Sequence, residues 1–190
     1  MRVDTISGQP VIEVDRFCLR PLRPSDAGVL QLYAADRRVA EATSSIPHPY
    51  PPGAAEAFIA QAIRASQAAS QDPGPGERRG IVWAMDGSGR NLGELLGVIA
   101  LKCMDRSQAE IGYWVAPAFW NTGIASAAVQ ALVETNPLNC KAYFAQVFQD
   151  NPASARVLTK AGFEYIGDAE TFSVARDTIV PTWTYIRKLA

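Results

Sequence analysis

The sequence predicts an α/β protein of the α+β kind, built on one mixed, mostly antiparallel sheet of about seven strands with helices on both faces. Segments typical of strands and helices follow one another in the order β-α-α-β-β-β-α-β-α-β-β. Three consecutive strands in this order imply antiparallel pairing, whereas one β-α-β step around residues 109–148 implies a parallel pair. No internal repeat or linker divides the 190 residues, so we expect a single domain over residues 1–190.

The composition narrows the classes of function. Hydrophobic residues make up 48% and charged residues 19% of the chain, which is typical of a globular protein. A net charge of −1 gives no basic field that would attract nucleic acid or an acidic membrane. Residues 1–10 are polar, unlike a signal peptide, and no apolar run approaches the ~20 residues that span a bilayer. We expect a cytoplasmic protein, with residues 1–10 as a candidate flexible tail.

The residues that could bind a metal are few and scattered. Cys18, Cys103 and Cys140 form no CxxC pair, and His48 is the one histidine of the chain. This pattern predicts buried, reduced thiols and no metal site.

The N-terminal half predicts one strand and two helices. Residues 11–22 are rich in valine and isoleucine and end at prolines, which predicts the first strand. Residues 24–42 predict a helix that Ser25 or Asp26 caps, with Leu32 on its apolar face. Four prolines make residues 44–53 an extended loop, and residues 54–70 predict a second helix. Residues 71–80 (QDPGPGERRG) predict a breaker or a hairpin-like link.

The C-terminal half predicts the remaining strands. They cover residues 81–86, 92–104, 108–117, 139–148, 162–178 and 179–190. Before the last two strands, residues 151–163 predict a short helix, in which Asn151 is the cap, Pro152 takes the first position and Gly162 ends the helix.

A glycine stands where the helix after strand 108–117 begins, in AFWNTGIASAAVQALVE (residues 118–134). The first amides of a helix lack internal partners and carry partial positive charge. Gly123 and Ala125 have little or no side chain, so an anion can approach these amides, and Thr122 and Ser126 can add hydroxyl contacts. The motif predicts a phosphate or pyrophosphate site, and a tight strand-to-helix corner is the alternative.

Several motifs together resemble the GNAT superfamily of N-acetyltransferases, and within it the RimJ/RimL-like branch. They are FCLRPLRPSDAGVLQLY, IPHPYPPGAAEAFI, LGVIAL, AEIGYWVAPAFWNTGIASAAVQALVE and NPASARVLTKAGFEYIG. The family's pyrophosphate loop, (Gln/Arg)-x-x-Gly-x-(Gly/Ala), corresponds here to residues 120–125, and a tryptophan at its first position is usual in that branch. The resemblance implies acetyl-CoA as the donor substrate and a splayed parallel strand pair that holds it.

The resemblance also implies which residues contact the donor. The pyrophosphate would bind the amides of residues 121–126, and the pantetheine would pair along residues 113–116 between splayed strands. Arg156 and Lys160 would reach the nucleotide end, with ordinary surface charge as the alternative role of both. The implied donor-binding residues are Trp114, Val115, Trp120, Asn121, Thr122, Gly123, Ile124, Ala125, Ser126, Asn151, Ser154 and Arg156.

The same resemblance suggests catalytic groups. Glu110 would be the base that deprotonates the amine, and a backbone N–H near Trp114 or Val115 would hold the oxyanion. Many relatives carry a tyrosine where this chain has Leu158, so Ser154 is the expected substitute that assists the leaving thiolate. A covalent acetyl-cysteine is disfavoured, because no motif places a histidine beside a cysteine.

The acceptor is expected to be an amine, either a protein N-terminal α-amino group or a small molecule, bound by His48, Tyr50 and Trp83. The alternatives are a surface position without a role for His48 and a place in the core for the aromatic residues. Phe58, Tyr33 and Glu41 are further candidates for its pocket. The missing tyrosine favours an alternative, a non-catalytic acyl-CoA-binding regulatory module. A dinucleotide enzyme is disfavoured, because the glycines of GELLGVIA lie inside a strand pattern. The chain could be a monomer or a homodimer.

Overall fold

The computed structural model describes residues 3–6, 9–70 and 80–189, and within them one nine-stranded sheet in the order β1-β2-β3-β4-β5-β6-β7-β9-β8. The pair β6–β7 is parallel and every other pair is antiparallel. The strands are β1 Val3–Ile6, β2 Gln9–Val14, β3 Phe17–Pro21, β4 Ile81–Asp86, β5 Gly97–Met104, β6 Gln108–Val115, β7 Ala142–Phe148, β8 Glu164–Ser173 and β9 Thr178–Lys188. The α-helices are α1 Ala27–Ala34, α2 Arg37–Glu41, α3 Ala54–Ser70, α4 Ile124–Thr135 and α5 Pro152–Lys160.

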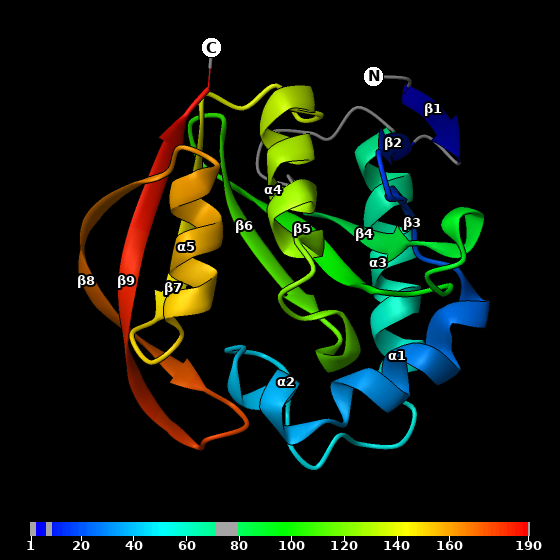
Figure 1. Ribbon diagram of the computed structural model, residues 1–190, viewed down its shortest axis with the longest axis horizontal. Helices are drawn as coiled ribbons and strands as arrows, with labels where there is room; N and C mark the ends of the chain where they lie inside the picture. The colour runs from blue at the N-terminus through cyan, green and yellow to red at the C-terminus, as the bar shows by residue number, and fades with distance from the viewer. Residues whose placement is uncertain (1–2, 7–8, 71–79, 190) are drawn as a thin grey trace.

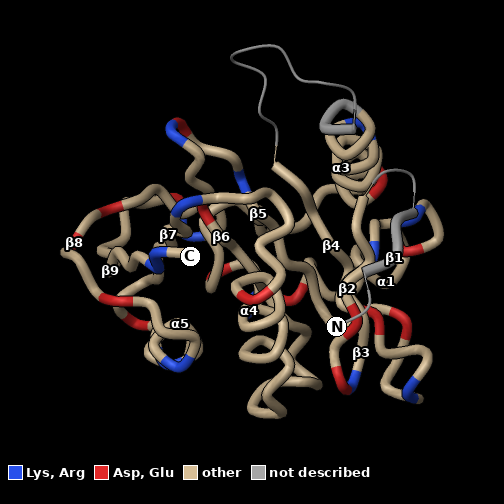
Figure 2. The backbone as a smooth tube through the Cα atoms, turned by 90° about the horizontal axis from the view of Figure 1, so that it is seen from above, with Lys and Arg blue, Asp and Glu red and all other residues tan. Residues whose placement is uncertain are grey.

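Helices cover both faces of the sheet, as predicted. Figures 1 and 2 show α4 and α5 on one face and α3 on the other, and Figure 1 shows α1 and α2 across one end of the sheet. The larger core cluster joins the sheet to α4 and α5 through residues such as Leu132 and Leu158. A smaller cluster joins the opposite face to α1 and α3 through Leu30 and Ile59. The sheet is therefore buried from two sides.

The N-terminal part differs from the prediction of one strand. Residues 9–21 form a hairpin of β2 and β3, with Ile12 opposite Leu19 and a turn at Asp15 and Arg16. Residues 3–6, within the stretch expected to be a tail, form β1 and pair with β2. These changes raise the number of strands from about seven to nine.

The predicted helix over residues 24–42 is divided. A 3-10 turn at Pro24–Asp26 leads into α1, and Asp36 has extended backbone (ψ 120°) and accepts a hydrogen bond from the Arg38 N–H at the start of α2. Asp26 does not cap α1 with its side chain; it binds the buried Arg20 guanidinium at 2.8 Å. Leu32, expected on the apolar face, is exposed. The predicted link over residues 71–80 lies, except for Gly80, outside the described residues.

The other predicted elements are present, but the strand predicted over residues 92–104 begins only at Gly97, and the one predicted over residues 162–178 ends at Ser173. Helix α3 has the expected bounds, and β4, β5 and β6 pair antiparallel in sequence order. Asn151 caps α5 by accepting the Ser154 N–H at 3.2 Å, and Gly162 has the left-handed φ of 76° that ends the helix. Local capping chemistry therefore predicted α5 correctly.

The parallel pair opens into a fork. Strands β6 and β7 pair only from Gln108 opposite Ala142 to Glu110 opposite Phe144. Beyond that point β6 stays paired with β5, and β7 stays paired with β9. The splayed pair that the resemblance implied is present, and Glu110 stands where it opens.

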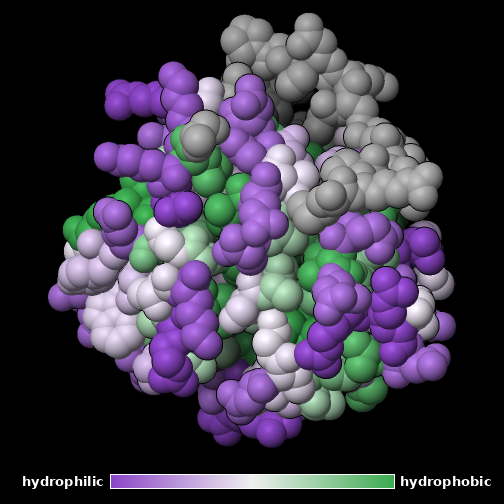
Figure 3. Space-filling model, turned by 45° about the horizontal axis from the view of Figure 1, so that its top comes forward, coloured by the Kyte–Doolittle hydropathy of each residue, from purple (hydrophilic) through white to green (hydrophobic). Residues whose placement is uncertain are grey.

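The surface in Figure 3 mixes hydrophilic and hydrophobic residues over the part of the face that is coloured. In the described part of the chain, no helix combines the length and apolar character that crossing a membrane requires.

Candidate functional site

The open edge of β6 presents backbone groups to the fork. The Ala116 N–H donates to the Leu96 carbonyl at 2.9 Å, and the antiparallel register continues with Val98 opposite Trp114. Because neighbouring residues of a strand direct their N–H and C=O groups to opposite sides, the backbone groups of Trp114 face β5. Those of Tyr113 and Val115 face the fork. Of the two amides expected to hold an oxyanion, only that of Val115 is directed there.

The corner between β6 and α4 leaves the first helical amides uncovered. Asn121 and Gly123 have positive φ values of 60° and 85°, and Gly123 is an N-cap without a side-chain hydrogen bond. A Cβ atom added at Gly123 would meet nothing within 4 Å, so no side chain of the described chain fills this space. The corner therefore fits an anionic group on the amides that begin α4.

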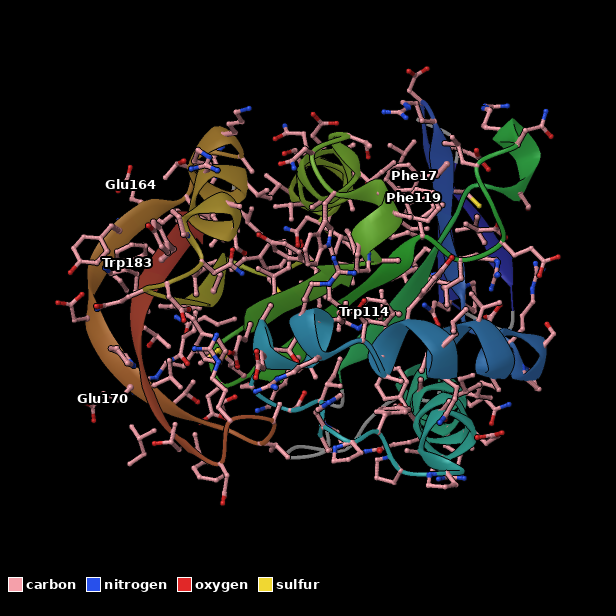
Figure 4. All side chains as sticks on the ribbon, turned by 60° about the horizontal axis from the view of Figure 1, so that its bottom comes forward. Phe17, Trp114, Phe119, Glu164, Glu170 and Trp183 are labelled. Atoms are coloured by element: carbon pink, nitrogen blue, oxygen red, sulfur yellow. The ribbon has the colours of Figure 1, made fainter. Side chains whose placement is uncertain are left out.

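Aromatic residues fix the corner in place. The Trp120 indole N–H donates to the Val115 carbonyl at 2.7 Å, and the Arg38 guanidinium lies 5.4 Å from the centre of the Trp120 ring. Phe119 packs against the core cluster that contains Phe17, and both are labelled in Figure 4. These contacts tie the corner to β6, to α2 and to the core.

A cavity of about 750 Å³, which we call the corner cavity, lies between this corner and α5. All the residues expected to bind the donor line it except Thr122. The Thr122 hydroxyl instead donates to the Phe119 carbonyl at 2.6 Å, so its proton is used within the corner. Lys160 also lines the cavity.

The corner cavity carries excess positive charge. Its basic side chains are Arg38, Arg156, Lys160 and Arg176. Arg38 pairs with Asp36 at 2.7 Å and Arg176 with Asp150 at 2.6 Å. Arg156 and Lys160 form no ion pair with another described residue, which leaves both available to an anionic ligand.

A second cavity of about 570 Å³, the inner cavity, lies between the fork and the loop that follows α2. Tyr113, Trp114, Asn151 and Ser154 line both cavities, so the two meet at the fork. Glu110 lines the inner cavity and does not line the corner cavity. Trp114, near the middle of Figure 4, lies beside the junction of α1 and α2.

Sequence reasoning missed Tyr113, which lies where the corner cavity and the inner cavity meet. The Tyr113 Oη atom lies 2.8 Å from the Ser154 Oγ atom and also donates to the Ser154 carbonyl at 3.2 Å. Burial raises the pKa of Tyr113 to about 12, and the hydrogen bond to Ser154 opposes this shift. The phenol therefore stays protonated at neutral pH and can hold the serine hydroxyl in place. Tyr113 comes three residues after Glu110, but only the packing of α5 against β7 and α4 brings Ser154 to it.

Only some of the residues expected at the acceptor pocket line a cavity. Tyr50 and Phe58 line the inner cavity. His48 is exposed and lines neither cavity. Trp83 is fully buried and donates its indole N–H to the Pro10 carbonyl at 2.9 Å, so its assignment to an acceptor was wrong.

The remaining candidates also differ from expectation. Tyr33 lines neither cavity, and Glu41 lines the corner cavity. Residues of β7 and β9 that sequence reasoning did not select, among them Gln146 and Thr182, line the inner cavity instead. Cys103 and Cys140 line neither cavity.

A forked strand pair, an uncapped helix start and two meeting cavities define a protein suited to bind an extended anion next to a second molecule. The chain belongs to the acetyltransferase (GNAT) domain family, whose model matches residues 16–164.

Individual proteins agree with this assignment. The Bacillus subtilis (strain 168) protein YoaA, described as an uncharacterized N-acetyltransferase, is 34% identical over 113 residues, which span 57% of this chain and 63% of YoaA. The match therefore covers less than two thirds of that relative.

Solved structures share the fold. The self-immunity acetyltransferase MccE, in complex with acetyl-CoA and AMP, has a TM-score of 0.76 at 16% identity and is matched over 92% of this chain and 93% of its own. Mycobacterium smegmatis RimJ, in complex with a CoA-disulfide, has a TM-score of 0.74 at 18% identity over 94% of this chain and 85% of its own.

Proposed function

We propose that this protein is an N-acetyltransferase that moves the acetyl group of acetyl-CoA directly to a primary amine in a ternary complex. The observation that carries the proposal is the meeting of two cavities at the fork, where Tyr113, Asn151 and Ser154 line both. Membership of the GNAT domain family supports the reaction class.

The donor would occupy the corner cavity. Its pyrophosphate would accept hydrogen bonds from the open amides at the start of α4, with Arg156 and Lys160 facing the charged nucleotide end. The amides of the pantetheine arm would pair with the Tyr113 backbone on the free edge of β6, as an added strand does. The Val115 carbonyl already accepts the Trp120 indole N–H, so of Val115 only the N–H is left for the acetyl group. The acetyl group would then reach the fork, where the inner cavity begins.

The transfer needs a neutral amine. Glu110 would take one proton from the ammonium, directly or through a water, which restores the nitrogen lone pair. That lone pair forms the new C–N bond to the thioester carbonyl carbon, and the Val115 N–H would hold the developing oxyanion. Collapse breaks the C–S bond, and its electron pair leaves with sulfur. The second amine proton passes to solvent, and the thiolate, hydrogen-bonded by the Ser154 hydroxyl, takes up one proton to give CoA.

A non-catalytic acyl-CoA-binding module is the alternative that Leu158 favours. Leu158 is fully buried and offers no proton donor. Ser154 lies one turn before Leu158 in α5 and is hydrogen-bonded by Tyr113 of β6. Its hydroxyl group could serve where Leu158 cannot.

Two measurements test the proposal in sequence. Thermal-shift binding with acetyl-CoA tests the donor site, and release of free CoA with a panel of amines tests the chemistry. Binding followed by amine-dependent release supports the transferase. Binding without release for any amine would favour the regulatory module instead.

A further inference from the structure

We infer that the acceptor is a primary amine on an uncharged, largely apolar body, and not a polyamine or a free amino acid. This inference rests on the proposed N-acetyltransferase function and concerns the inner cavity.

The charge inventory of the inner cavity is the first observation. Glu110 is the one side chain with a full charge at neutral pH among the residues that line it. The walls are mainly apolar, and include Leu30, Ile46, Phe58, Val98, Trp114, Val147, Phe148 and Leu158. A single carboxylate can neutralise a single ammonium group. A second charge on the ligand would lose its hydration without gaining a partner, which is costly in an apolar cavity.

The position of Glu110 is the second observation. Glu110 stands opposite Phe144, where β6 and β7 separate, so it lies at the fork. An ammonium bound there would lie next to the junction of the two cavities, and the rest of the molecule would extend along the apolar walls. A free amino acid would place its carboxylate one carbon away from this ammonium and close to Glu110. Because the inner cavity has no cationic lining residue, that carboxylate would be repelled.

A buried hydroxyl group indicates where a neutral polar group of the acceptor can bind. Thr182 of β9 lines the inner cavity and is fully buried, and its Oγ1 atom has no hydrogen-bond partner among the described residues. A buried polar group without a partner is unfavourable. A carbonyl or hydroxyl group on the acceptor could satisfy this hydroxyl without adding charge.

The loop after α2, which forms one wall of the inner cavity, is held by hydrogen bonds, and these fix the size of the cavity. Ser44, Ile46 and Tyr50 line the cavity from the loop after α2. The tip of the β8–β9 hairpin holds this region, because the Val174 N–H donates to the Ser44 carbonyl at 3.0 Å and the Arg176 Nε–H donates to the Glu41 carbonyl at 2.8 Å. A volume of about 570 Å³ is ordinary for a site that encloses a small molecule or one end of a chain.

The test compares acceptors that differ mainly in charge. Free-CoA release would be measured with phenethylamine, phenylalanine amide, a phenylalanine-initiated tripeptide amide, phenylalanine and spermidine. We expect kcat/KM for the best of the first three to exceed that for phenylalanine and spermidine by about 100-fold or more, since unpaired buried charge is rejected strongly. Comparison of phenethylamine with the tripeptide amide distinguishes a small-molecule acceptor from a peptide N-terminus.

A charge variant sharpens the test. Gln146 lines the inner cavity on β7, two residues beyond Phe144 and therefore on the same face of the sheet. Gln146→Glu adds a second carboxylate of the same shape and should raise kcat/KM for spermidine relative to phenethylamine by about tenfold. Gln31→Glu, on α1 and outside both cavities, is the matched control and should leave the ratio unchanged.

The outcomes are distinguishable. Spermidine or phenylalanine acetylated as well as the neutral-bodied amines would overturn the acceptor class and leave the transferase intact. An unchanged spermidine ratio in Gln146→Glu would also overturn it. If acetyl-CoA binds and no amine releases CoA, the transferase itself is refuted, and the acceptor class is refuted with it.

Discussion

A carboxylate introduced at Gly123 should expel the donor. Gly123 has a φ of 85°, and an added Cβ would contact nothing within 4 Å, so a substitution here begins in open space. Any such residue costs about 1 kcal/mol for the left-handed backbone, whatever its charge. Gly123→Gln and Gly123→Glu therefore share the backbone cost and differ in one negative charge beside the proposed pyrophosphate site.

The charge term can be estimated. Two unit charges about 5 Å apart repel by about 3 kcal/mol at an effective dielectric constant of 20. Gly123 is exposed, so solvent reduces this value. We expect Gly123→Glu to bind acetyl-CoA about 30- to 100-fold more weakly than Gly123→Gln, since each factor of ten is about 1.4 kcal/mol.

Isothermal titration calorimetry with acetyl-CoA at two salt concentrations measures this difference. High salt should narrow the gap between the two variants and leave the backbone term unchanged. Equal dissociation constants for Gly123→Gln and Gly123→Glu would refute the placement of the pyrophosphate at this corner.

Three other substitutions test the remaining parts of the fold and the site. Glu110→Gln should lower turnover by about 100-fold or more while acetyl-CoA affinity changes little, because an amide cannot take the amine proton; steady-state kinetics and calorimetry measure both. Tyr113→Phe should remove a pH dependence of stability measured by urea unfolding. The tyrosine ionises near 10 when unfolded and about 12 when folded, so stability present below pH 10, up to about 2.7 kcal/mol, is lost as the pH rises from 10 to 12. Arg20→Met leaves buried Asp26 and Asp86 without their cation and should cost about 3–5 kcal/mol in urea unfolding.

Each of these expectations has a contrary result. Unchanged turnover in Glu110→Gln would exclude that carboxylate as the base. Stability curves of wild type and Tyr113→Phe that stay parallel from pH 10 to 12 would exclude the raised phenol pKa. A loss below about 1 kcal/mol in Arg20→Met would mean that water reaches Asp26 and Asp86 and replaces the ion pairs.

Elements with local chemical signals were predicted from the sequence, and elements without them were missed. Helix α5 carries its cap, its first-position proline and its terminating glycine in consecutive sequence. The turn between β2 and β3 uses Asp15 and Arg16, and neither has positive φ. It therefore needs no glycine or asparagine, and residues 11–22 resemble one continuous strand.

The same distinction holds at the site. Gly123 could be predicted, because a small residue at a helix start has a local reason. The contact of Tyr113 with Ser154 joins residues 41 positions apart and depends on how α5 packs against β7 and α4. Trp83 shows the opposite error. Aromatic residues suit both a pocket wall and a core, and only the face on which Trp83 lies places it in the core beside Ile99.

Leu158 illustrates that a functional group absent from one element at the fork can be supplied by a neighbouring element. Where many related proteins carry a tyrosine, α5 has Leu158 and therefore no phenol. This difference by itself favours a non-catalytic binding module. Ser154 lies one helical turn earlier, and the Tyr113 phenol approaches it from β6 at 2.8 Å. With a pKa of about 12, that phenol remains a donor at neutral pH. The single Tyr113 proton can be donated to the Ser154 carbonyl or to the Ser154 Oγ atom. When it is donated to Oγ, the serine proton is left for an acceptor at the fork, such as a leaving sulfur. The sheet thus supplies a phenol where the helix lacks one, and the loss at Leu158 does not by itself imply a loss of catalysis.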